Sequence, residues 1–239
     1  MKTLFKQFIS AVVISAAFSF LVSCNESPND PADAAPKAGS TYTFAEYEVD
    51  ASGTVNPDSR MTTTDSLLST SLSFFGSEGV HQVSSKSEYA YFKTFQNGSF
   101  DVYQDGITIT DGIEVAPMWV HYDASSPLDT IFSNAVSAEF NGFPGTMTLI
   151  VTTEGKGNSS YTTKSGKTLS TIEIEKNFTV VVAIDGVGVV STTAVTTKLS
   201  YSPELQYIVR EEVVSNSDSP FSPIENGKSV RELSSYSIK

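Results

Sequence analysis

The sequence is poor in the residues that most often carry metal and redox chemistry. It has one cysteine, Cys24, and two histidines, His81 and His121, among 239 residues. A single cysteine excludes an internal disulfide and a multi-cysteine zinc or iron–sulfur site. Neither histidine lies in a metal-ligand spacing such as HExxH. We therefore expect no catalytic residue, no cofactor, no metal and no enzymatic activity.

Positive charge is also scarce. The chain has 15 lysines and arginines against 27 aspartates and glutamates, a formal net charge of -12. Nucleic-acid binding needs a concentrated basic surface, because the phosphates of the partner must be neutralised. The charge balance therefore predicts that nucleic acid is not a partner.

The N-terminus has the pattern of a secretion signal. Lys2 and Lys6 precede an uncharged stretch from Phe8 to Leu21 that is too short to cross a bilayer comfortably. The stretch ends in Leu21-Val22-Ser23-Cys24, which resembles the lipobox of bacterial lipoproteins. The alternative is an ordinary signal peptide with a cysteine near its end. The position of the only cysteine favours the lipobox.

The lipobox resemblance implies that residues 1–23 are a cleaved signal peptide and that Cys24 carries diacylglycerol and acyl chains such as palmitate. Cleavage would remove Lys2 and Lys6 and no acidic residue, leaving 216 residues with a net charge of -14. Anionic headgroups repel such a chain, so we expect the lipid alone to anchor it. Asn25, where an aspartate would favour inner-membrane retention, leans the expected location in the cell envelope toward the outer membrane.

The residues after Cys24 predict a tether followed by one domain. Residues 24–40 are rich in Pro, Ala, Asp and Asn and have almost nothing apolar to bury, so they are expected to form a flexible linker. Residues 41–239 show no internal linker and no repeat of fixed period. We therefore predict a single β domain over residues 41–239.

The body of the chain alternates between apolar and polar residues. The clearest case places Ile172, Ile174, Phe178, Val180 and Val182 on one face, interrupted by Lys176, with polar residues on the other. This split is typical of an antiparallel sheet with one face in a core. Further strands are expected at Thr41–Val49, Ser87–Phe95, Ser99–Gln104, Ile113–Tyr122, Thr146–Thr153, Val187–Tyr201, Gln206–Val214 and Val230–Ile238.

Asn-Gly, Asp-Gly and related glycine turns separate these strands and favour hairpins. They lie at Asn97-Gly98, Asp105-Gly106, Asp111-Gly112, Asn141-Gly142, Gly155 to Asn158, Ser165-Gly166, Asp185-Gly186 and Asn226-Gly227. The fold class predicted is all-β, or mostly β with short helices at Asp65–Phe75 and Ser126–Ser137. The expected architecture is an antiparallel up-and-down curved sheet or half-barrel, with a β-sandwich as the alternative.

Candidate chemistry has ordinary structural explanations. The pairs Glu173/Glu175 and Glu211/Glu212 suggest two-carboxylate glycoside chemistry, but solvated charge is the favoured interpretation. Asp101, Asp105 and Asp111 lack the spacing of a calcium loop, and hairpin turns explain them. The aromatic surplus, 11% of the chain, clusters in Tyr89–Phe95 and Trp119–Tyr122. These rings could line a cavity for acyl chains or a platform for sugars, although an ordinary sheet core is favoured.

The C-terminal part of the chain resembles a known group. From Lys167 onward a glycine turn and two long strands lead into Tyr201-Ser202-Pro203-Glu204-Leu205, then Val209-Arg210-Glu211 and Glu232-Leu233-Ser234-Ser235-Tyr236. This order resembles uncharacterised envelope lipoproteins common in Bacteroidota, which are similar to lipoprotein carriers with a curved sheet around an apolar concavity. The usual glycine after the leucine is Gln206 here. The resemblance implies a fold and a compartment, but no catalytic residue.

Pro203 explains the turn without the resemblance, because it cannot donate a ladder hydrogen bond and ends a strand. Tyr201, Leu205, Tyr207 and Val209 are then expected to close the edge of the sheet.

Two hypotheses follow from these observations. The first is a non-enzymatic, lipid-anchored envelope protein that binds a lipid or other apolar ligand in its concave sheet. The second is a β-sandwich surface lipoprotein for adhesion or glycan binding. The membrane, reached through the lipid on Cys24, is the one partner expected in both cases.

Overall fold

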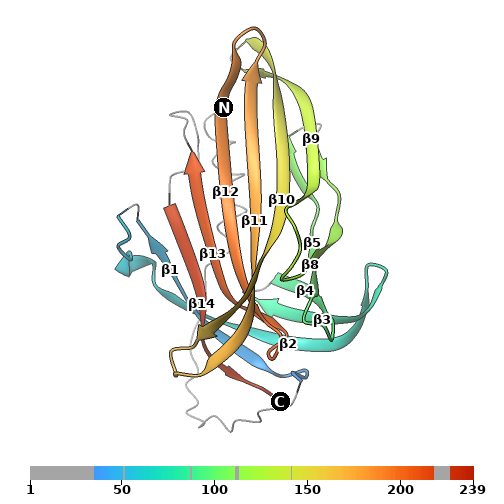
Figure 1. Cartoon of the computed structure of the whole chain (residues 1–239), viewed down its shortest axis with the longest axis vertical. Helices are drawn as coiled ribbons and strands as arrows, with labels where there is room; N and C mark the ends of the chain where they lie inside the picture. The colour runs from blue at the N-terminus through green and yellow to red at the C-terminus, as the bar shows by residue number, and fades with distance from the viewer. Residues whose placement is uncertain (1–34, 51, 87, 111–112, 141, 218–226) are drawn as a thin grey trace.

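The computed structural model describes residues 35–50, 52–86, 88–110, 113–140, 142–217 and 227–239 (Figure 1). Twelve strands form one antiparallel sheet in the order β8-β5-β4-β3-β2-β1-β14-β13-β12-β11-β10-β9. Its strands are β1 (Thr41–Val49), β2 (Met61–Phe74), β3 (Ser77–Ser85), β4 (Glu88–Thr94), β5 (Phe100–Gln104), β8 (Met118–Tyr122), β9 (Asp129–Phe140), β10 (Phe143–Thr162), β11 (Thr168–Ile184), β12 (Gly188–Ser202), β13 (Tyr207–Ser217) and β14 (Gly227–Ser237). A separate hairpin pairs β6 (Ile107–Thr110) with β7 (Ile113–Val115).

The sheet curls until its two ends approach each other, so that it is nearly closed into a barrel. The end strands are β8 and β9; β8 comes close to β10, and β7 comes close to β9. The prediction of an all-β antiparallel curved sheet is therefore confirmed. Because one continuous sheet carries these strands, the β-sandwich alternative does not describe the fold.

Most expected strands are present. The prediction for Thr41–Val49 matches β1 residue for residue, and the alternating segment around Ile174 forms β11. Turns are confirmed at Asn97-Gly98, Ser165-Gly166 and Asp185-Gly186. Asp111-Gly112, Asn141 and Asn226 lie outside the described residues.

Both predicted helices are wrong, because each segment is a strand. The segment Asp65–Phe75 lies in β2 except for Phe75, which is in the turn that follows. The pairing of β2 with β3 shifts register between Leu67 and Ser69, between Ser69 and Leu72, and between Leu72 and Phe74. Each bulge breaks the alternation of period two and leaves apolar residues at helix-like spacings. The segment Ser126–Ser137 lies largely in β9, where Asn134 and Ala138 weaken the apolar side of the alternation. The described residues contain one short 3-10 turn, η1 (Pro57–Ser59), and no α-helix.

Two boundaries also differ from the prediction. Ile113–Tyr122 is split into β7 and β8, because Pro117 interrupts the ladder. The expected turn at Gly155 to Asn158 is instead a bulge within β10. Glycine is needed at 155 for a close backbone approach, since a Cβ there would lie 2.3 Å from the carbonyl oxygen of Asp123.

The lower half of the molecule, where the chain ends in Figure 1, has a filled core. Rings from opposite walls meet inside it: Phe100 of β5 stacks on Tyr201 of β12 at 3.9 Å between centroids, and Phe92 of β4 meets Tyr207 of β13 edge-on at 5.3 Å. The two apolar clusters of this half draw on β1–β5, β8 and β11–β14. Opposite sides of the curled sheet therefore pack directly against each other here.

The upper half is different. Parts of β9 to β12, residues 130–140, 143–153, 176–184 and 188–197, continue upward beyond the rest of the sheet (Figure 1) and are called the extension. Its inner face is largely apolar, although Asn134 and Thr193 also lie on it. The apolar residues of this face are Phe132, Val136, Phe140, Met147, Leu149, Val151, Phe178, Val180 and Val182. Apart from Met118 and Ile131 at its base, these residues make up its entire apolar cluster. In the described residues, the cluster is therefore built almost wholly from one wall.

The turn after β12 forms in spite of its unusual residue. Gln206, which stands where the resemblance leads one to expect glycine, has a φ of 49° in the left-handed region that glycine favours. Tyr201, Leu205, Tyr207 and Val209 are all buried. They lie on or between β12 and β13 in the middle of the sheet, so the expectation that they close its edge is wrong.

Candidate functional site

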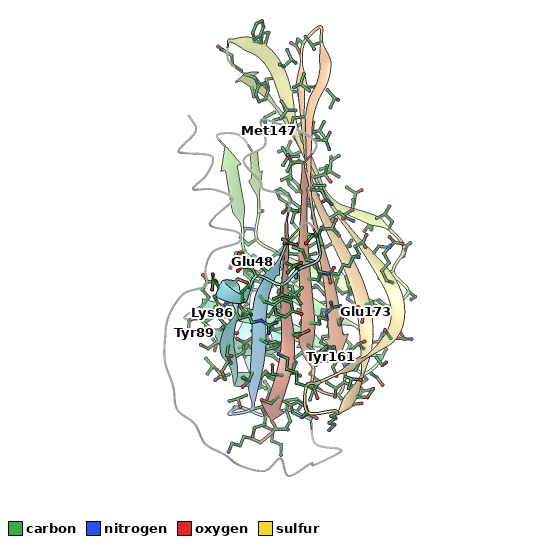
Figure 2. All side chains as sticks on the ribbon, turned by 90° about the vertical axis from the view of Figure 1, so that its left-hand side faces the viewer. Glu48, Lys86, Tyr89, Met147, Tyr161 and Glu173 are labelled. Atoms are coloured by element: carbon green, nitrogen blue, oxygen red, sulfur yellow. The ribbon has the colours of Figure 1, made fainter. Side chains whose placement is uncertain are left out.

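A layer of charged side chains lies inside the curled sheet between the filled lower core and the extension. We call it the polar belt, and it consists of Glu46, Asp65, Lys86, Lys176, Glu211 and Arg231. Cross-strand pairing aligns three of them, since Arg231 of β14 lies opposite Glu46 of β1 and Glu211 of β13. Figure 2 shows the level of this layer at Lys86, with Met147 of the extension far above it.

Arg231 is the centre of the belt. Its Nε donates to Glu46 Oε1 at 3.1 Å, and its Nη2 donates to Oδ2 of the fully buried Asp65. The guanidinium also lies 3.6 Å from the ring centroid of Phe44. Because the charge is held by two carboxylates and one ring, Arg231 is a structural cation.

The carboxylates around Arg231 are held tightly. The Tyr207 hydroxyl donates to Asp65 Oδ2 at 2.7 Å, while Asp65 Oδ1 is buried without a hydrogen-bond partner. Burial raises the pKa of Glu46, but hydrogen bonds from Lys86 and Thr63 and the charges of Lys86 and Arg231 outweigh it and lower the pKa overall. Burial and the nearby Asp65 raise the pKa of Tyr207 well above its usual value. Glu46 is therefore ionised and Tyr207 neutral near pH 7.

Lys176 and Glu211 form the looser part of the belt. Lys176 reaches across the interior from β11 and donates to Gln104 Oε1 of β5 at 2.7 Å, above the core rings. Burial lowers the pKa of Lys176, partly offset by Glu211. Burial, with Glu46 and Asp65, raises the pKa of Glu211, although Arg231 and Lys176 oppose this. Lys176 and Glu211 therefore place two ionisable groups at the foot of the apolar extension.

The extension continues the inner face above the belt without another charge. Along β11, Phe178, Val180 and Val182 follow Lys176 on the same side, and they pair with Val151, Leu149 and Met147 of β10. The β10 residues are buried, with Leu149 fully so, whereas those of β11 are half-buried. The arrangement suits an elongated apolar group lying along the strands with a polar floor beneath it.

Openings in the lower half have a different character. One open depression of about 410 Å³ is bordered mainly by amides and hydroxyls, including Gln96, Asn97, Asn158 and Thr171. A second, of about 270 Å³, lies beside Glu46, Arg60 and Lys164. Most of the side chains that border these two depressions are polar or charged, so the extension is the better candidate for an apolar ligand.

The predicted lipid attachment site, Cys24, lies outside the described residues. The histidines lie apart from the belt. His81 is buried in β3, and burial lowers its pKa. His121 is exposed on β8, where its Nδ1 lies 2.6 Å from Asp101 Oδ1. In the described part of the chain His121 has no second hydrogen-bond partner, so no nucleophile accompanies this dyad.

The carboxylate pairs divide as follows. Glu173 is on the outer face, where it accepts hydrogen bonds from Thr171 and Ser200, and Glu175 lies 3.9 Å from Lys156. The interpretation of the second pair as solvated charge is wrong. Glu212 is buried against Lys228 and Arg210, because these cations surround it, and Glu211 faces the belt.

The aromatic clusters are divided between the two faces of the sheet. Phe92 and Tyr122 point into the core, whereas Tyr91 and Trp119 lie on the outer side with Tyr103. The core interpretation of these rings is therefore only half correct. The outer rings form a surface of their own.

Among the described residues no group of three metal-ligating side chains comes together. The same part of the chain contains no helix with the length and hydropathy of a membrane span. No family profile matches the chain, and no curated protein or solved structure is significantly similar to it. The site is therefore interpreted from its own chemistry.

The polar belt is the feature that the sequence interpretation missed. A signal for it exists, because Glu46 follows Tyr42 and Phe44 at the spacing of the inward face, and Arg231 precedes Leu233 in the same way. Lys176 interrupts the apolar side of β11 identically. Charged residues that fall in phase with an apolar alternation therefore point to a buried ionic layer.

Proposed function

We propose that this chain is a lipid-anchored cell-envelope protein without enzymatic activity that holds an apolar ligand, such as a lipid acyl chain, on the inner face of its extension. The acyl chains on Cys24 would anchor it, in the outer membrane more than in the inner. The observation that carries the ligand proposal is the apolar inner face of the extension, which continues beyond the point where the core is filled.

The packing of the two halves supports the assignment of the ligand to the extension and not to the lower half. In the lower half the interior is occupied by stacked rings and by the belt, so a ligand has no room between the walls. In the extension the apolar cluster belongs to β9, β10 and β11, with Met118 at its base. Each methylene that such a face removes fully from water would contribute about 0.8 kcal/mol, and one covered on a single side contributes less.

The ligand proposal is tested by native mass spectrometry of the full chain after extraction in a mild detergent. We expect a co-purifying lipid with the wild type. Val180→Asp places a charge on the inner face and should abolish the lipid peak. Val181→Asp is the matched control, because Val181 lies next along β11 on the opposite face, and it should keep the lipid. Lipid retained in the inner-face variant, or none in the wild type, would contradict the proposal.

The anchor is tested by replacing Cys24. Cys24→Ala removes the thiol that lipidation requires, so labelled palmitate should no longer be incorporated and the protein should leave the membrane fraction. Ser23→Ala retains the thiol and serves as the control. Membrane retention of the Cys24→Ala chain, with no label in either chain, is the outcome that would exclude the lipid anchor.

A further inference from the structure

Aromatic rings cover the outer surface of β4, β5 and β8, on the side of the sheet away from the belt. We call this surface the outer aromatic patch; it consists of Phe74, Phe75, Tyr91, Tyr103 and Trp119. Tyr89 extends it along β4 and is 56% exposed. The rings come from three neighbouring strands and from the tip of the β2–β3 hairpin, which Figure 1 shows reaching out beyond the sheet.

The rings are ordered by contacts with one another. Phe74 stacks on Tyr91 with centroids 3.8 Å apart, and Tyr103 meets Phe74 edge-on at 4.9 Å. Trp119 lies 5.5 Å from Tyr103, and its Nε1 donates to the Phe75 carbonyl oxygen at 3.2 Å. The patch is therefore a preorganised surface, because its rings hold one another in place.

Phe75 is held outward at a cost to the backbone. Phe75 and Gly76 form the two-residue turn of the hairpin with φ values of 44° and 74°, the pattern of a type I′ turn. Asparagine is favoured at the first of these positions, whereas a bulky residue is strained there. The Phe75 ring nevertheless stays 54% exposed. A strained residue that leaves an aromatic ring in solvent is typical of a functional position.

The charges around the patch select the class of partner. Asp105 lies near Tyr103, Glu78 lies at the hairpin, and Asp101 is on the same face of β5, where it contacts His121 and lies opposite Lys93 of β4. With a net charge of -12 for the chain, an anionic membrane or nucleic acid would be repelled. Carboxylates and tyrosine hydroxyls do hydrogen-bond to neutral hydroxyl groups. A ligand ring that is flat, apolar on its two faces and hydroxylated at its edges would fit both the aromatic surface and the hydrogen-bonding groups around it.

We infer that the outer aromatic patch is a binding site for a neutral polysaccharide of β-linked pyranose rings, independent of the ligand on the extension. The C–H faces of the sugars stack on Phe75, Trp119 and Tyr89, and their hydroxyl groups meet the surrounding carboxylates and phenols. The site binds its ligand without transforming it.

The single tryptophan of the chain provides the measurement, since Trp119 lies within the patch. The full chain is titrated with hexamers of β-1,4-linked glucose and of β-1,4-linked N-acetylglucosamine while Trp119 fluorescence is followed. We expect a saturable change with at least one neutral hexamer. An oligogalacturonate hexamer, which is anionic, should bind at least tenfold more weakly.

Two variants separate binding from folding. Phe75→Asn relieves the turn and should leave the melting temperature unchanged or higher, yet weaken hexamer binding at least tenfold. Tyr89→Ser removes an exposed ring and should also weaken binding. Phe143→Asn is the matched control, because Phe143 is 61% exposed at the far end of the molecule, and it should bind as the wild type does.

Three outcomes would overturn the inference. The first is no fluorescence change with either neutral hexamer. The second is unchanged affinity in both patch variants. The third is concentration-dependent self-association that Phe75→Asn abolishes in analytical ultracentrifugation, which would assign the patch to a second copy of the chain.

Discussion

The lower half and the extension share strands β11 and β12 but bury their inner faces differently. In the lower half, side chains from opposite walls interlock, and Phe100, Tyr42, Tyr201 and Leu233 are at most 1% exposed. In the extension, Phe178, Val180 and Val182 of the same β11 remain half-buried. One alternating pattern along β11 thus continues from a region where its inward side chains are buried into one where they are half-buried.

This difference separates stability from function within one sheet. A filled interior contributes free energy of folding, because every side chain is removed from water by a partner across the core. In the extension, the half-buried side chains of β11 leave apolar area for a ligand to bury, whereas Met147, Leu149 and Val151 of β10 are already buried. The polar belt marks the boundary, since Lys176 crosses the interior between the two regions.

The largest effect is expected when one phenylalanine is replaced by alanine in each region and the losses of stability are compared. Phe100→Ala removes a fully buried ring that stacks on Tyr201 and Tyr122, so we expect a loss of about 4 kcal/mol in the free energy of unfolding. Phe178→Ala in the extension should cost about 1 kcal/mol, because its ring is only half-buried. Urea unfolding measures both. Equal losses would show that the extension is packed as tightly as the core.

Removing the central cation of the polar belt should destabilise the fold nearly as much as removing the Phe100 ring. Arg231→Met leaves the buried Asp65 without its cation, and we expect a loss of about 3 kcal/mol. Arg210→Met is the control on the outer face, where the pair with Glu212 is more exposed, and should cost less than about 1 kcal/mol. If the two variants lost the same amount of stability, Arg231 in the belt would contribute no more to folding than the outer Arg210.

The adjacent residues Glu211 and Glu212 should make the stability of the fold depend on pH in opposite directions. The raised pKa of Glu211 means that the folded chain binds its proton more tightly than the unfolded chain does, so this residue lowers stability as pH rises from about 4 through the folded pKa. Glu211→Gln should therefore stabilise by about 1 kcal/mol at neutral pH and remove that slope.

Glu212 is the matched control for this measurement. Burial raises its pKa, but Lys228 and Arg210 outweigh burial and lower the pKa overall. Its contribution is therefore present at neutral pH and lost as pH falls through the lowered pKa. Glu212→Gln should destabilise at pH 7, in thermal melts recorded from pH 4 to 8. The same sign for both variants would contradict the opposite pKa shifts of Glu211 and Glu212.

The smallest effect is expected at the turn that leads into β13. Gln206→Gly should raise the free energy of unfolding by about 0.5 kcal/mol, because the left-handed φ of 49° strains any residue with a Cβ. Gln104→Gly, on a strand, should destabilise instead. Urea unfolding midpoints measure both effects. A loss of stability in Gln206→Gly would show that the Gln206 side chain is needed in the turn.

Alternation predicts most of the strands because a sheet with one buried face demands it. It fails in β2, where bulges move Leu72 and Phe74 out of phase, and in β9, where Asn134 replaces an apolar inward residue. It also cannot show that β14 pairs with β1, since that pairing joins the two ends of the domain. Long-range pairing of this kind leaves no local pattern in the chain.

The candidate surfaces are harder to predict than the strands. The inward phase of Glu46, Lys176 and Arg231 is visible in the sequence, but their convergence depends on the curl of the sheet. The split of Tyr91 from Phe92 and of Trp119 from Val120 follows from alternation alone. Phe74 joins the outer rings only because the β2–β3 hairpin folds over them, which no spacing indicates.

One measurement tests the central claim, that the extension rather than the lower half receives an apolar ligand. The purified full chain is mixed with a fatty acid that carries a diazirine at its methyl end and is then illuminated. The cross-linked peptides are identified by mass spectrometry. We expect adducts on inner-face residues such as Met147, Phe178 and Val180, and their loss in Val180→Asp. Adducts confined to the lower half, or spread evenly over the surface and unchanged in Val180→Asp, would contradict the claim.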